Sequence, residues 1–132
     1  MNDQFGKKKK RPEELKQDTE SELGDLIWTL CCFANPRTIE LDALPIPHQE
    51  ETDPMLLMVR LSKASGDFAD TVYIMHKEPT FEWRPVAEEQ LAGIIAVIYK
   101  FAEILDFDVR EAFVKAHEKV KQRDRDRYTE KK

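Results

Sequence analysis

The chain has 132 residues, of which 41% are hydrophobic and 36% are charged. This length suits one compact domain with a single hydrophobic core and does not favour a second one. The formal net charge of -5 argues against general nucleic-acid binding, because a duplex-binding surface needs an excess of Lys and Arg facing the phosphates.

The N-terminal third of the chain predicts a basic tail followed by a helix. Residues 1–11 include the run KKKKR and are expected to form a disordered, solvated tail rather than a functional patch. Pro12 suits the first position of a helix, because its missing N–H would have no partner there. The helix is predicted to run to about residue 35, before Pro36, because its apolar residues recur at spacings of three and four. These residues are Leu23, Leu26, Ile27, Leu30 and Ala34.

The middle of the chain predicts an irregular connection and a second helix. Residues 36–53 contain three prolines and are expected to be irregular, with a short helical turn near Leu41. Residues 54–77 predict a helix with an apolar stripe that includes Leu57, Leu61 and Phe68. Gly66 costs this helix about 1 kcal/mol relative to Ala, so it indicates a close helix crossing.

The last third predicts two more helices. Residues 85–105 are apolar on nearly all sides, which is typical of a helix that is central or lies at an oligomer interface. A dimer that pairs through Ile94, Ile98 and Phe101 is therefore expected. Asp108 and Glu111 have the spacing of a capping box, which predicts the start of a fourth helix. Residues 124–132 are expected to fray as a charged tail.

Together these elements predict an all-α, four-helix bundle formed by residues 12–123. Each apolar stripe can be buried only against the other helices.

The adjacent Cys31 and Cys32 could form only a strained disulfide with each other and are read as small core residues of a reducing compartment. There is no signal-peptide pattern, and the longest apolar run is too short to cross a bilayer. The expected location is the cytoplasm, with no membrane or nucleic-acid partner.

The clearest chemical pattern is the pair Glu22 and Asp25 on the first predicted helix. Residues three apart lie one turn apart, so both carboxylates could bind one divalent cation, and hard oxygen ligands suit Mg²⁺. The alternative is a solvated acidic face, which is the commoner role of such rows. The spacing alone leaves both readings open.

The run ELGDLIWTL, residues 22–30, resembles the E-x-x-D helix of the MazG-like nucleoside triphosphate pyrophosphohydrolases. Residues 61–70, LSKASGDFAD, resemble the E-E-x-x-E helix of the same family. In that segment Asp67 matches an acid, whereas Lys63 and Ala64 stand in place of the first two glutamates. A third segment, residues 86–95 followed by 104–109, is similar in layout to the family's E-x-x-D helix and its turn into the last helix, but Gln90 and Gly93 replace the acid pair. The order of the two motif helices is also reversed relative to the family.

The resemblance implies Mg²⁺-dependent cleavage of a nucleoside triphosphate between the α and β phosphates, releasing pyrophosphate, as in the cleaning of nucleotide pools. It implies that Glu22, Asp25 and Asp67 are catalytic acids and metal ligands, with Asp70 as a further ligand. The cations would neutralise phosphate charge and activate the attacking water. A homodimer or a dimer of dimers is expected.

Three other residues are candidates for substrate binding. Lys63 and Arg60 could contact the substrate phosphates, and Trp83 could stack on a base, although packing over the end of the bundle is the simpler role for Trp83. The alternative function comes from a different class: a catalytically degenerate helical dimer that binds a nucleotide or a protein partner. Pyrophosphate release with and without Mg²⁺ separates the two.

Overall fold

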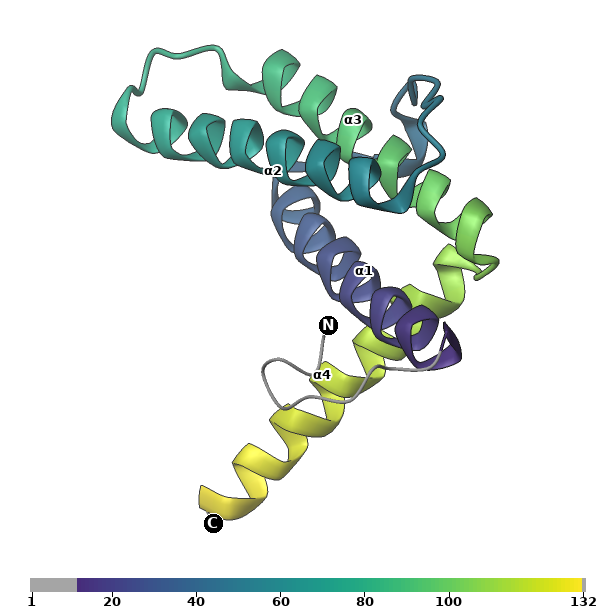
Figure 1. Cartoon of the computed structure of the whole chain (residues 1–132). Helices are drawn as coiled ribbons and strands as arrows, with labels where there is room; N and C mark the ends of the chain where they lie inside the picture. Colours follow the sequence, from purple (N-terminus) through teal and green to yellow (C-terminus); the bar gives the residue numbers. More distant parts are fainter. Residues whose placement is uncertain (1–11, 132) are drawn as a thin grey trace, which may run out of the picture.

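The computed structural model describes residues 12–131, so the predicted tail of residues 1–11 lies outside the described part of the chain. The four α-helices are α1 (Pro12–Ala34), α2 (Pro54–Lys77), α3 (Trp83–Leu105) and α4 (Val109–Lys131), and two short 3-10 helices are η2 (Asn35–Arg37) and η3 (Leu41–Ala43). The described residues form no strand (Figure 1). The predicted all-α class with four helices is therefore confirmed, as is the helical turn near Leu41.

Local chemistry accounts for most of the helix ends. The Asp53 side chain accepts a hydrogen bond from the backbone N–H of Met55 at 2.9 Å and caps the start of α2. The Asp108 side chain accepts from the backbone N–H of Glu111 at 3.0 Å, which confirms the predicted cap of α4. α3 ends at Leu105, and the φ of 57° at its C-cap residue, Asp106, lies in the left-handed region. α4 continues to Lys131, further than the expected end near residue 123.

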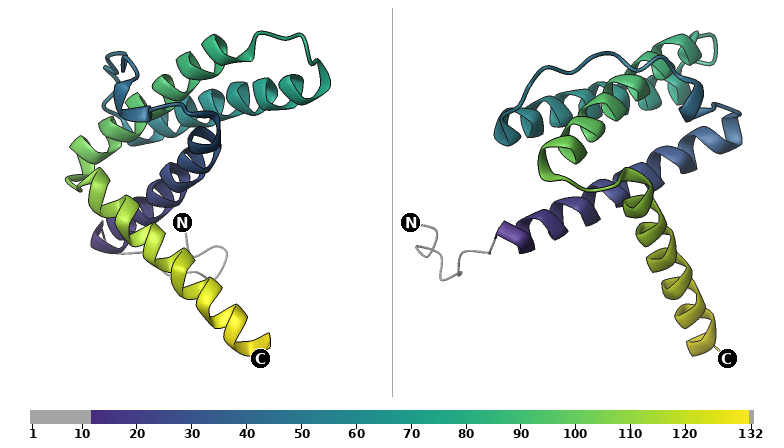
Figure 2. Two further views of the ribbon diagram at one scale, coloured as in Figure 1. Left: turned by 180° about the vertical axis from the view of Figure 1, so that it is seen from behind. Right: turned by 90° about the vertical axis from the view of Figure 1, so that its right-hand side faces the viewer.

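The helices pack as two pairs. α2 lies along α3, and α1 crosses α4. Far fewer residues are in contact between the two pairs than within each pair. The second half of α4 extends away from the other three helices (Figure 2). Among the described helices, none combines enough length with enough apolarity to cross a lipid bilayer.

The core is built around α3. Ile94 and Ile98 are each 1% exposed and Phe101 is 2% exposed, because α2, α1 and the connection after α1 cover this helix from several sides. The expected dimer through these three residues is therefore wrong. α3 is apolar on nearly all sides because it is the central helix of its own chain, and not because it lies at an oligomer interface.

The close helix crossing occurs at Gly24, where α1 meets α4, and not at Gly66. A Cβ on Gly24 would overlap the backbone carbonyl oxygen of Ala112 and would lie 2.9 Å from its carbonyl carbon. A Cβ on Gly66 would meet no atom within 4 Å. Gly66 lies on the exposed side of α2, so no contact within the described chain explains it.

Candidate functional site

Two acidic residues of α1 lie beside lysines of α4. Asp25 Oδ1 is 3.0 Å from Lys119 Nζ. Glu20 Oε2, more than one turn earlier, is 3.2 Å from Lys115 Nζ. Glu22 is exposed. Glu20 and Asp25 therefore form ion pairs that join α1 to α4. The Lys119 ammonium occupies the position beside Asp25 to which a divalent cation would also be attracted.

The candidate residues of α2 are held by neighbours on the same surface. Lys63 Nζ lies 3.0 Å from Asp67 Oδ2, as an i,i+4 pair on an exposed face. Arg60 donates a hydrogen bond to Gln49 Oε1 at 3.1 Å. Asp70 is exposed. The two basic residues expected at substrate phosphates thus bind acceptors of their own chain.

Trp83 packs at the end of the helices. Its ring lies edge-on to that of Phe33, with 6.2 Å between the ring centroids, and it is partly buried against the core. The Arg84 guanidinium lies 5.3 Å from the centroid of the Trp83 ring. This is the packing role that the sequence also allows.

The two acid pairs do not meet within one chain. α1 touches α2 near its C-terminal end, where the rings of Phe33 and Phe68 are 4.9 Å apart. Asp25 lies about 12 Å and Glu22 about 16 Å further back along α1, at 1.5 Å of rise per residue. In the described part of the chain, no group of three or more His, Cys, Asp or Glu side chains is placed to hold a metal ion. A cluster that combines Glu22 and Asp25 with Asp67 and Asp70 would therefore need acids from two chains, and it stays a prediction.

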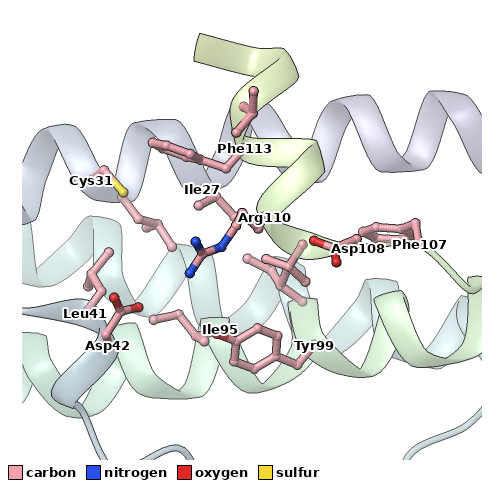
Figure 3. A pocket seen from close by; sticks show the side chains of 14 residues that line it. Ile27, Cys31, Leu41, Asp42, Ile95, Tyr99, Phe107, Asp108, Arg110 and Phe113 are labelled. Atoms are coloured by element: carbon pink, nitrogen blue, oxygen red, sulfur yellow. The ribbon is translucent and has the colours of Figure 1, made fainter.

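A cavity of about 810 Å³ lies between α1, α3, α4 and η3. Its walls are mainly aliphatic and aromatic, and they include Ile27, Ile95 and Phe113 (Figure 3). The volume falls within the range of about 300 to 1,000 Å³ that is usual for small-molecule sites. The cavity is partly open to solvent, and the ring of Tyr99 lies at its edge.

Three charged side chains line this cavity. Arg110, from the first turn of α4, extends into it between Asp42 of η3 and Asp108 of the α4 cap (Figure 3). Among the described residues, Arg110 forms neither an ion pair nor a hydrogen bond through its side chain. A guanidinium is permanently charged and offers five N–H donors, so it suits an anionic oxygen of a ligand.

Cys31 also lines the cavity, but it is poorly suited to act as a nucleophile. Burial raises the pKa of its thiol, and the nearby Cys32 and Asp42 raise it further. The reactive form of cysteine is the thiolate, which a raised pKa disfavours at neutral pH. Cys32 is exposed, so the expectation that both cysteines are core residues is wrong for Cys32.

No sequence motif indicates this cavity. Its residues come from three α-helices, from η3 and from the connection between α3 and α4, so no local spacing links them. One signal was available: Arg110 is a cation in the first turn of a helix, where it opposes the helix dipole and is unfavourable without another reason.

Comparison with known proteins found no matching family model, no matching curated protein and no matching solved structure. The resemblance to the MazG-like family thus rests on the motif segments alone.

Proposed function

We propose that this chain is a MazG-like helical module that binds a nucleotide in the cavity beside Arg110 without hydrolysing it. The observation that carries the proposal is the cavity itself, which combines apolar walls, two carboxylates and one guanidinium that has no partner within residues 12–131. A base would contact the walls and Tyr99, and a phosphate would bind Arg110.

The pairing of the acids supports binding over hydrolysis. Asp25 and Asp67 each have a lysine ammonium at 3.0 Å, from Lys119 and Lys63 respectively. Each ammonium cancels the charge that would attract Mg²⁺ and lies where the cation would have to approach. Exposed ion pairs are individually weak and can be broken. The competing arrangement to be tested is therefore a metal site that combines the acids of α1 from one chain with the acids of α2 from another.

The charges in the cavity decide which nucleotide suits it best. Arg110 contributes one positive charge, whereas Asp42 and Asp108 contribute two negative charges. A triphosphate would meet a single cation and two carboxylates, which repel it. A nucleoside monophosphate places less negative charge there, and its amino and hydroxyl groups can donate to the carboxylates. The expected preference is therefore monophosphate over triphosphate.

Thermal unfolding with a panel of ribo- and deoxyribonucleoside mono- and triphosphates tests the proposal, because a ligand that binds only the native state raises the melting temperature. A monophosphate is expected to raise it. The shift should disappear in Arg110→Ala and persist in Arg123→Ala, a matched variant on α4 outside the cavity.

The same panel, assayed for pyrophosphate release with and without Mg²⁺, tests the competing hydrolase. Mg²⁺-dependent release that is lost in Asp25→Ala would overturn the binding-only proposal and favour catalysis by acids of two chains. A cavity that gives no shift with any nucleotide would remove the nucleotide-binding proposal as well.

A further inference from the structure

The outer face of α2 is apolar and uncovered. α2 packs along its length on α3, and its opposite side carries no other helix (Figure 1). Met55 is 71% exposed, Val59 is 57% exposed and Tyr73 is 64% exposed. A contiguous apolar patch on a surface marks an interaction site, so the residues between these three decide whether the face is continuous.

These residues belong to one seam with the spacing of a helix pair. We call it the α2 seam, and its spacings of four, three, four, three and four are those of the a and d positions of a heptad repeat. Its members are Met55, Val59, Ser62, Gly66, Ala69 and Tyr73. None of them is charged, and all six are exposed.

The α2 seam is symmetric about Gly66. Ser62 and Ala69 are the small residues on either side of it, and Val59 and Tyr73 are the larger residues beyond them. The centre of the seam is thus narrow and its ends are wide. Because a Cβ on Gly66 would meet nothing within its own chain, the centre is open to another helix. The order of small and large residues is therefore nearly the same in a reversed copy, as a two-fold axis requires.

The charges beside the α2 seam have the same symmetry. Lys63 and Asp70 lie on one flank, three residues before and four residues after Gly66. In an antiparallel pair centred on Gly66, Lys63 of each copy lies opposite Asp70 of the other. Opposite charges therefore meet twice in this arrangement.

We propose that two copies of this chain form an antiparallel homodimer through the α2 seam, with the two-fold axis at Gly66. Val59 of each copy packs against Tyr73 of the other, and Ser62 packs against Ala69. The seam matches its own reverse in the size of its residues and in the charges beside it, and this symmetry points to a second copy as the occupant. This proposal is independent of the nucleotide cavity, which lies between other helices.

The length of α2 limits the area that the dimer can bury. Its 24 residues span about 36 Å, and a face of about 11 Å width then buries on the order of 800 Å² over both copies. Stable interfaces bury about 1,200 to 2,000 Å², so this one belongs to the small, weakly associating class. A monomer–dimer equilibrium in the micromolar range is expected.

Sedimentation equilibrium of the full chain, from low to high micromolar concentration, tests the proposal. Val59→Glu places two carboxylates in the seam and is expected to weaken the dimer at least tenfold. Leu15→Glu, an equally exposed apolar site on α1, is the matched control and should leave the Kd unchanged. Circular dichroism checks that each variant keeps its helix content.

A charge swap tests the antiparallel register. Lys63→Asp alone and Asp70→Lys alone each place like charges opposite one another and should weaken the dimer severalfold. The double variant should restore it, because the two opposed pairs are formed again with reversed signs. A chain that stays monomeric at all concentrations, a dimer insensitive to Val59→Glu, or a double variant as weak as the single ones would overturn the proposal.

Discussion

Gly24→Ala tests whether α1 and α4 cross as closely as the structure shows. The new Cβ would overlap the carbonyl oxygen of Ala112 and lie 2.9 Å from its carbonyl carbon, both rigid backbone atoms. The two helices must therefore move apart, which disturbs their contacts on both sides of the crossing. Gly93→Ala is the matched control, because Gly93 is also helical and a Cβ there meets nothing within 4 Å.

The magnitude follows from two opposing effects. Replacing a helical Gly by Ala stabilises a helix by about 1 kcal/mol, and this gain is common to both variants. Overpacking against rigid neighbours costs about 1 to 3 kcal/mol and applies to Gly24 alone. Gly93→Ala should therefore raise the free energy of unfolding relative to the unchanged protein. The free energy of unfolding of Gly24→Ala should be lower than that of Gly93→Ala by about 1 to 3 kcal/mol.

Urea denaturation followed by circular dichroism measures this difference. The protein concentration is kept low and equal in all samples, so that self-association does not contribute to the free energy of unfolding. If Gly24→Ala is as stable as Gly93→Ala, the close crossing of α1 and α4 is incorrect.

Three further predictions concern a cap, an ion pair and a thiol. Asp108→Ala removes the acceptor for the backbone N–H of Glu111 at 3.0 Å and should lower the free energy of unfolding by about 0.5 to 2 kcal/mol in urea denaturation, whereas Asp108→Asn should retain most of it. Lys119→Ala removes an exposed ion pair with Asp25 and should cost less than about 1 kcal/mol in the same assay, with added salt reducing the difference. Alkylation of Cys31, measured by mass spectrometry, should be slow at neutral pH, because the raised pKa keeps the thiolate scarce. The rate should rise only at a higher pH than for an unperturbed thiol. Fast alkylation at neutral pH would contradict the burial of this side chain.

The helices themselves could be predicted from the sequence because their signals are local. Pro12, Pro36 and Pro54 fix helix starts or stops through φ and the missing N–H, and the Asp108 cap depends on a backbone N–H only three residues away. The apolar stripe of α2 likewise identified the face that packs on α3, since Leu57 and Leu61 are buried. Periodicity of 3.6 residues is enough to say which side of a helix is covered.

Periodicity does not say what covers that side. Only the tertiary structure shows which element packs on each apolar face. The apolar surface of α3 could have met its own chain or a second copy, and the fold buries Ile94 against its own helices. Gly24 and Gly66 both lie in helices, and only the path of α4 makes Gly24 the crossing point. Asp42 and Arg110 line the same cavity although they are far apart in the sequence. Such contacts depend on how helices are placed in three dimensions, and the spacing of residues along one helix carries no information about that placement.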